Sequence, residues 1–165
     1  MIQVKDVVKS FDGNVVLNHV SANFEDGKVN MIIGQSGSGK TVLMKSMIGL
    51  HQIDEGEIIF DTSDGKQQNL AAMTEKDVRL LHREVGMLFQ GSALFDSMTV
   101  QENVMYPLEM FSDMTDEEMV ARARFCLERV NMPERAFGLM PSEISGGMQK
   151  RVAIARAIAL NPRYL

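Results

Sequence analysis

The sequence lacks tryptophan, has a single cysteine and contains no long uninterrupted run of apolar residues. Because Cys126 has no second cysteine to pair with, an internal disulfide is excluded, and a reducing compartment is favoured. No stretch approaches the roughly 18 consecutive apolar residues that a membrane-spanning helix needs. The first residues also lack the apolar core of a signal peptide. We therefore expect a soluble cytosolic chain that reaches a membrane only through partner proteins.

The chain also lacks an excess of positive charge. It has 17 Lys and Arg against 22 Asp and Glu, a net charge of −5. Nucleic-acid binders usually carry a concentrated basic face, so we expect no nucleic-acid partner. The 165 residues are 45% hydrophobic and 24% charged, the composition of an ordinary globular protein. That length suits one domain or one and a half.

The beginning of the chain is predicted to be rich in β-structure. Residues 2–8 ("IQVKDVV") and 15–24 ("VVLNHVSANF") alternate apolar and polar side chains, and Asp12 and Gly13 stand between them. Turn dipeptides between alternating runs are typical of a β-hairpin. Residues 62–69 ("TSDGKQQN") are polar enough to predict a surface loop.

Three further strands and a helix are expected in the first half. Residues 28–33 ("KVNMII") predict a buried strand that leads into glycines, and residues 55–60 and 84–89 predict two more strands. Residues 40–50 have the apolar spacing of a helix. Its apolar side would comprise Val42, Leu43, Met47 and Leu50.

Helical patterns dominate from about residue 95 to residue 140. Thr115 and Glu118 have the spacing of a capping box, in which each side chain bonds the other's backbone N–H. Thr74 and Asp77 form a weaker version, because Asp is shorter than Glu. The last helix is expected to begin near Gly146 and to end before Pro162, since the residue before a proline avoids helical geometry.

The most specific motif is "GQSGSGKT" at residues 34–41, which fits the pattern G-x-x-x-x-G-K-[ST]. Glycines let backbone N–H groups converge on phosphate oxygens, Lys40 would neutralise β- and γ-phosphate charge, and Thr41 would offer a hydroxyl to Mg²⁺. A flexible glycine-serine loop would not need to lie between a predicted strand and an amphipathic helix, as this motif does. The predicted nucleotide-binding residues are Phe11, Gly34, Gln35, Ser36, Gly37, Ser38, Gly39, Lys40, Thr41 and Val42.

Three other features narrow the choice among nucleotide-binding proteins. Phe11 precedes a turn and could stack on an adenine ring, although such an aromatic is as often simple packing. Gln90 would end a strand at the edge where open α/β sheets bind ligands. Ser145 and Gly147, in "SGG", would open the last helix and form a second anion site at its N-terminus. Two phosphate sites so far apart suggest that two copies face each other.

Together these residues resemble the ATP-binding subunit of ABC transporters along essentially the whole chain. Phe11 matches the adenine-stacking aromatic, residues 34–41 the Walker A loop, Gln90 the Q-loop and residues 144–162 the signature helix. Met148 departs from the Gln that usually follows "SGG". This variant and its surroundings are most similar to ATPases of Mla-type lipid transporters, which work with MCE proteins.

The resemblance implies a cycle and partners. ATP would be held between residues 34–41 of one copy and the signature of the other in a homodimer, with Mg²⁺ at Thr41 and Gln90. Lys40, Gln90, Ser145 and Gly147 would carry the catalytic roles. Closure of this ATPase dimer would drive transmembrane permease subunits. The dimer would lie at the cytoplasmic side of the inner membrane. Phospholipid is the implied cargo.

The expected fold class is α/β, a P-loop NTPase core of mainly parallel strands with an antiparallel β layer and an inserted helical subdomain. Residues 1–92 would form the ATP-binding core, 93–145 the helical subdomain, and 146–165 the signature helix and the start of the Walker B strand. The family's Walker B Asp and Glu and its switch His have no match in the sequence. We therefore expect a fragment that binds nucleotide without hydrolysing it.

The sequence also bears on other functional classes. A small GTPase would need an Asn-Lys-x-Asp tetrapeptide to read guanine, and the sequence has none. A nucleotide kinase would use a mobile arginine-rich lid, for which Arg122, Arg124 and Arg129 are candidates, although a solvated helix face explains them as well. A third alternative, for the 165 residues taken alone, is a nucleotide-binding module without catalytic activity.

Overall fold

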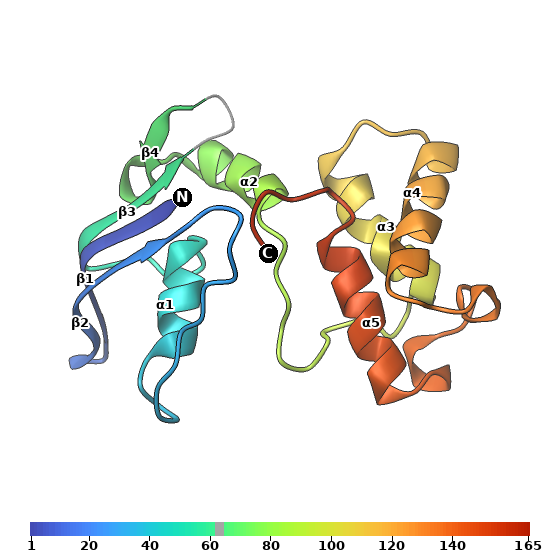
Figure 1. The fold of residues 1–165 in the computed structure, drawn as a ribbon, viewed down its shortest axis with the longest axis horizontal. Helices are drawn as coiled ribbons and strands as arrows, with labels where there is room; N and C mark the ends of the chain where they lie inside the picture. Colours follow the sequence, from blue (N-terminus) through green and yellow to red (C-terminus); the bar gives the residue numbers. More distant parts are fainter. Residues whose placement is uncertain (62–64) are drawn as a thin grey trace. The chain divides into compact units, whose positions relative to one another are not determined.

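The computed structural model describes residues 1–61 and 65–165. It forms two compact units, Met1–Leu81 and His82–Leu165, which are described one at a time. Figure 1 shows the β-strands in the first unit and α3, α4 and α5 in the second. The functional division at residues 92 and 145 is a separate prediction, which these packing units do not address.

The first unit is built on a four-stranded sheet with the order β2-β1-β3-β4. The strands are β1 (Ile2–Phe11), β2 (Asn14–Phe24), β3 (Glu55–Asp61) and β4 (Gln67–Asn69), and all neighbours are antiparallel. The predicted hairpin and the strand near residues 55–60 are confirmed. Of the predicted loop at residues 62–69, residues 62–64 lie outside the described part, and Gln67–Asn69 form β4 instead.

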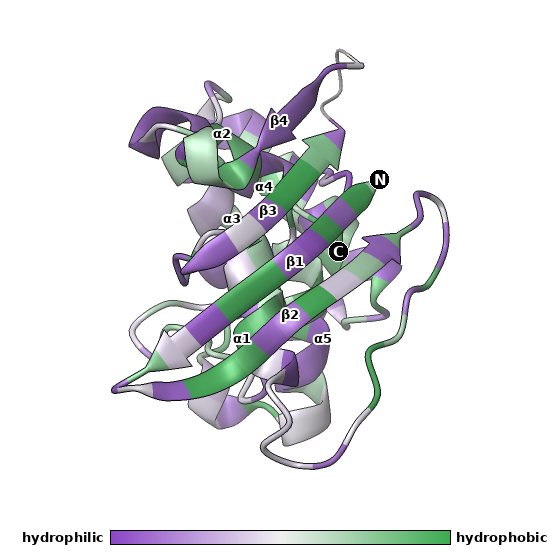
Figure 2. Ribbon diagram, turned by 90° about the vertical axis from the view of Figure 1, so that its left-hand side faces the viewer, coloured by the Kyte–Doolittle hydropathy of each residue, from purple (hydrophilic) through white to green (hydrophobic). Residues whose placement is uncertain are grey.

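The helices of the first unit follow from local sequence signals. Figure 2 shows α1 (Lys40–Met47) against one face of the sheet, and Leu43 and Met47 on this helix are buried. Leu50 lies beyond the helix end and is exposed, contrary to the prediction. A short 3₁₀ helix, η1 (Leu70–Ala72), precedes α2 (Glu75–Glu84). Thr74 accepts from the backbone N–H of Asp77, whose carboxylate accepts from Thr74, as the weaker capping box predicted.

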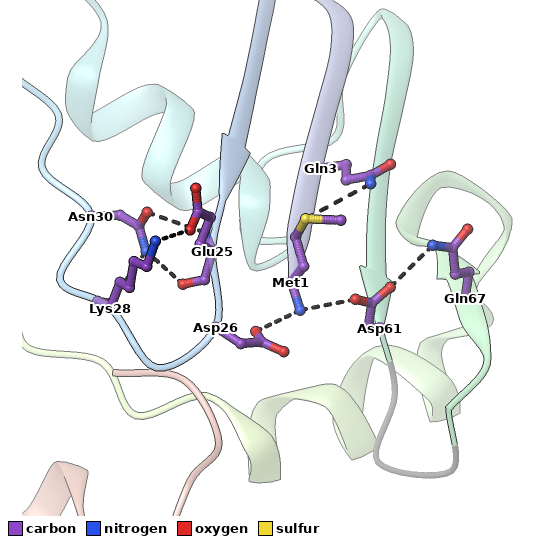
Figure 3. Close-up of polar contacts among 8 residues, drawn as sticks. All are labelled: Met1, Gln3, Glu25, Asp26, Lys28, Asn30, Asp61 and Gln67. Atoms are coloured by element: carbon purple, nitrogen blue, oxygen red, sulfur yellow. Dashed lines mark hydrogen bonds and ion pairs between the residues drawn. The ribbon is translucent and has the colours of Figure 1, made fainter.

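Two ion pairs connect the amino terminus to residues at the ends of β2 and β3. Figure 3 shows the Met1 ammonium between the carboxylates of Asp26, just after β2, and Asp61, at the end of β3. The Met1 nitrogen lies 3.0 Å from Asp61 Oδ2. The hydrogen bond from this ammonium, with a second from Gln67, holds the pKa of Asp61 below its ordinary value. The start of β1 is therefore fixed to both of its neighbours in the sheet.

The predicted buried strand at residues 28–33 is wrong. Val29, Met31 and Ile33 are 95%, 79% and 81% exposed, and the segment has no ladder partner in the described chain. A buried strand needs hydrogen-bonded neighbours. Here the Asn30 side chain instead accepts from the N–H of Glu25 and donates to its carbonyl, as Figure 3 shows. Such local bonds compete with strand pairing.

The second unit is helical. Its long helices are α3 (Val100–Phe111), α4 (Asp116–Arg129) and α5 (Gly146–Ala157), with 3₁₀ turns η2 (Glu134–Ala136) and η3 (Pro141–Glu143). Both α3 and α4 begin with capping boxes, the predicted one at Thr115 and a second at Thr99. The core they enclose includes Val104, Leu108, Ala123, Leu127 and Val152, all fully buried. The predicted end of α5 before Pro162 is confirmed.

The predicted strand at residues 84–89 is also wrong. Only Val85 pairs, in an isolated parallel bridge with Tyr164, while Leu88 and Phe89 are exposed. The bridge has two hydrogen bonds, Tyr164 N–H to the Glu84 carbonyl at 2.9 Å and Gly86 N–H to the Tyr164 carbonyl at 2.8 Å. A lone bridge with a single partner does not sustain a central strand. Of the predicted mainly parallel sheet, this bridge is therefore the only parallel pairing in the described residues.

Within residues 1–61 and 65–165, none of the helices combines the length and the apolar character needed to cross a membrane.

Candidate functional site

The phosphate-loop motif forms a backbone cradle at the start of α1. Gly39 precedes the helix with φ 86° and offers no side-chain cap, so the first N–H groups of α1 meet no capping side chain. Gly37 also has a positive φ, 81°. A Cβ at Gly39 would lie 3.0 Å from the Val16 carbonyl oxygen of β2. Glycine is therefore required here both by its φ and by the close approach of β2.

Lys40 places its positive charge within this loop. Its ammonium donates to the carbonyls of Gly34 at 2.9 Å and Gln35 at 2.6 Å. A Cβ on Gly34 would lie 2.8 Å from Ser38 Oγ, so the loop is closely curled at its base. A cation beside uncapped N–H groups at a helix N-terminus is an anion-binding arrangement. The charge and geometry of the loop suit the binding of phosphate groups.

The other predicted loop residues are accessible. Gln35, Ser36, Ser38 and Thr41 are exposed, and Val42 is half-buried on α1. The hydroxyl of Thr41 is a hard oxygen donor, the type that Mg²⁺ prefers. The Thr41 hydroxyl is therefore chemically suited to contribute one ligand to such an ion.

Phe11 is the last residue of β1, and its side chain is 39% exposed. The ring of His51 stands nearly perpendicular to it, with centroids 5.4 Å apart and an interplanar angle of 77°. The Lys9 ammonium lies over the Phe11 ring, 5.2 Å from its centroid. An exposed aromatic ring held by such contacts is able to stack on a flat base.

The signature residues lie at the N-terminus of α5, in the second unit. Ser145 is the N-cap, and its hydroxyl accepts from the Met148 N–H at 3.3 Å. A Cβ added at Gly146 would meet nothing within 4 Å, and one at Gly147 would meet only Ser145 Oγ, at 4.0 Å. Folding therefore does not require these glycines, although they lower helix propensity. The backbone at the start of α5 is therefore open on this side.

Gln90 is exposed in a turn and does not end a strand, contrary to the prediction. Shortly after it, Ser92 and Ala93 have positive φ values of 63° and 48°. The guanidinium of Arg156, on α5, donates to the carbonyls of Ser92 at 2.9 Å and Ala93 at 2.7 Å. Burial lowers the pKa of Arg156. The signature helix thus holds the segment that follows Gln90.

The structure groups the predicted residues by unit. The first unit contains Phe11 and residues 34–42, and the second contains Gln90, Ser145 and Gly147. Sequence reasoning missed Arg156, His51 and Asp54. The carboxylate of Asp54 bonds the segment before Phe11, and neither it nor His51 belongs to a motif that could have revealed it.

The arginines considered for a kinase lid have structural roles in the second unit. Arg122 donates to the carbonyls of Ile158 and Ala159 at the end of α5. Arg124 pairs with Glu134, and the Arg129 guanidinium lies over the Phe125 ring. Positive charge is stabilising at a helix C-terminus, so Arg122 acts as a C-terminal cap of α5. Arg122 and Arg124 are thus bound within their own unit.

Comparison with known proteins decides the family. The model of the ABC transporter family matches residues 17–165. This chain belongs to the ABC transporter family. A solved relative, the dimeric post-hydrolysis state of the ATP-binding cassette MJ0796 bound to ADP and Pi, superposes with a TM-score of 0.86. It is 32% identical and covers 98% of this chain and 71% of its own. The expected P-loop fold class is confirmed.

Curated relatives within the ABC family serve different cargoes. The methionine import ATP-binding protein MetN of Clostridium acetobutylicum is 39% identical over the whole chain, which covers 49% of it. The glutamine transport protein GlnQ of Escherichia coli K12 is 41% identical, and the chain covers 66% of it. The phospholipid transport protein MlaF of the same strain is 36% identical over 98% of the chain and 58% of its own length. The chain thus spans about half to two thirds of these ABC relatives.

Met148, which distinguishes the signature from the usual form, packs against the core of the second unit. An apolar side chain is favoured there by burial. Packing therefore accounts for the departure from Gln, and Met148 by itself does not indicate a cargo.

Proposed function

We propose that the chain is the ATP-binding part of an ABC transporter ATPase that powers a membrane permease from the cytoplasmic face of the inner membrane. The observation that carries the proposal is the phosphate loop, in which the Lys40 ammonium lies among the carbonyls of a glycine-rich turn before an uncapped helix. Membership in the ABC family and the ADP-bound relative support it.

In this proposal each residue group has its own task. Lys40 and the N–H groups of residues 34–41 bind the β- and γ-phosphates, and Phe11 stacks on adenine. The Thr41 hydroxyl and the Gln90 amide oxygen would be the ligands of Mg²⁺, which would supply charge neutralisation for phosphoryl transfer. The open N-terminus of α5 binds the γ-phosphate of ATP on a second copy, through Ser145 and Gly147.

The homodimer and the permease follow from the same proposal. The open backbone at Gly146 and Gly147 and the dimeric relative support a head-to-tail pair. Residues 93–145 and Gln90 would contact the permease. We expect residues 1–165 alone to release no phosphate above background, since no residue of the sequence matches the family's water-activating Glu. Such a group typically contributes about 10²–10⁴-fold.

Phospholipid is the proposed cargo, supported by the 36% identity to the MlaF relative. Import of a small amino acid is the second candidate, supported by the higher identities to the methionine and glutamine proteins. Turnover of a full-length form with its permease, in vesicles with and without phospholipid acceptors, separates them. Stimulation by an amino-acid-loaded binding protein instead would favour the second.

Ser145→Ala tests the two-copy arrangement. In a form extended to the length of the relatives, it should leave ATP binding by the monomer intact while strongly reducing turnover and ATP-dependent dimerisation. Nucleotide titration and sedimentation with and without ATP measure the two effects. Loss of binding in the monomer would show that the signature does not act on a second copy's nucleotide.

A further inference from the structure

The connection between α1 and β3 holds the segment that presents Phe11. Asp54 Oδ1 accepts from the Lys9 ammonium at 2.7 Å, and Asp54 Oδ2 accepts from the Ser10 N–H at 2.6 Å and the Ser10 hydroxyl at 2.7 Å. The Asp54 N–H donates to the Val8 carbonyl at 2.9 Å. Residues 8–10, immediately before Phe11, are therefore fastened to one residue of this connection.

His51 lies in the same connection and contacts the Phe11 ring itself, nearly perpendicular to it. Its own position is set by α1, because the N–H groups of Leu50 and His51 both bond the Lys45 carbonyl, at 2.9 Å and 3.3 Å. The same helix begins at Lys40. A single short helix therefore carries the phosphate-binding lysine at one end and the ring that supports Phe11 after the other.

We propose that His51 is a positioning residue for base recognition, which orients the Phe11 ring for a stacked base, and that Asp54 fixes the backbone from which this ring projects. The proposal rests on the proposed function, because it takes Phe11 as the platform for the base. The ligand class is a nucleoside triphosphate, and the effect of His51 is confined to its base.

Because the effect is expected on the base alone, comparing the affinities for two ligands separates a positioning role from a purely structural one. ATP and inorganic tripolyphosphate, each with Mg²⁺, share the phosphate chain and differ in the base. His51→Ala should weaken ATP binding by about threefold to tenfold, in the range of an aromatic pair contact, and leave tripolyphosphate binding unchanged. Lys40→Ala should weaken both ligands. His51→Phe keeps an aromatic ring and should restore ATP affinity.

Three further variants test the assignment. Phe11→Ala should lower ATP affinity at least as much as His51→Ala, and adding His51→Ala to it should cost nothing more, since His51 acts only through that ring. His19→Asn is the matched control: it removes an exposed imidazole from β2 at a φ of 50° that asparagine tolerates. It should change neither affinity.

Calorimetric titration of the 165-residue chain and these variants decides the matter, with thermal denaturation to confirm folding. The proposal is supported if only ATP binding responds to His51→Ala. Unchanged or tighter ATP binding overturns it, and so does an equal loss for both ligands. Where the unaltered chain binds ATP, either of these two results overturns this inference alone. A chain that binds neither ligand overturns the proposed function, and the inference with it.

Discussion

At the scale of single residues, Asp54 shows how a few short hydrogen bonds set an electrostatic property. The bonds from Lys9 and Ser10 lower the pKa of its carboxyl from the ordinary 3.8 to about 2. A lowered folded-state pKa means that the stabilisation is present above the unfolded value and is lost as the pH falls through the folded one. The relevant window therefore lies between about pH 4 and pH 2.

We predict that the stability difference between the protein and Asp54→Asn is largest near neutral pH and shrinks between pH 4 and pH 2. In that window the native carboxylate takes up a proton and gives up its bond from Lys9. Urea unfolding of both proteins across this range measures the difference. A gap that stays constant down to pH 2 would mean that these bonds do not depend on the charge of Asp54.

Ser46 contrasts with the hydrogen-bonded Asp54, because its hydroxyl is buried in α1 and has no hydrogen-bond partner within the described chain. An unsatisfied buried polar group costs about 1–3 kcal/mol. Ser46→Ala should therefore leave stability unchanged or raise it by about 1 kcal/mol. Ser10→Ala, which removes a bonded hydroxyl, should lower stability and is the control. Denaturant unfolding compares them, and a clear loss in Ser46→Ala would contradict the packing around α1.

At the scale of elements, two helix N-termini use glycine for different reasons. Gly39 before α1 needs its φ of 86° and its closeness to β2, whereas Gly147 in α5 has ordinary geometry and open space. Gly147→Ala should leave stability equal or raise it by up to about 1 kcal/mol. Gly39→Ala should destabilise the chain, because alanine does not tolerate this conformation.

Activity should respond differently from stability. In a form extended to the relatives' length, Gly147→Ala should reduce ATP turnover despite its unchanged or greater stability, because its methyl group would lie at the position proposed for a second copy's phosphate. Thermal unfolding and phosphate release measure the pair of effects. A Gly147→Ala protein that is stable and fully active would remove α5 from the proposed site.

Elements with short-range signals were predictable from the sequence. The hairpin turn at Asp12 and Gly13, the capping boxes at Thr74 and Thr115, and the start of α5 at Gly146 depend on neighbours within a few residues. The strands expected at residues 28–33 and 84–89 depend on partners far along the chain, which an apolar pattern does not reveal. Contacts such as Arg156 with Ser92, across 64 positions, have no local signal either.

At the scale of the whole molecule, apolar surface remains uncovered. Val29, Met31 and Ile33 alternate along one segment and are almost fully exposed. Adjacent exposed apolar side chains favour association. We predict concentration-dependent self-association of the chain, which Met31→Lys should reduce. Val15→Lys, at an exposed apolar residue of the hairpin, is the control and should have little effect. Light scattering over a concentration series tests this, and a chain that stays monomeric throughout would contradict it.

The central claim is that residues 34–41 bind the phosphates of ATP, and calorimetric titration of the chain with Mg²⁺ and ATP tests it most directly. Lys40→Ala should lower affinity by about tenfold or more, because a hydrogen bond to a charged group contributes about 1.5–3 kcal/mol. Lys45→Ala removes a lysine from the last turn of the same helix and should change affinity little. Unchanged ATP affinity in Lys40→Ala would contradict the account.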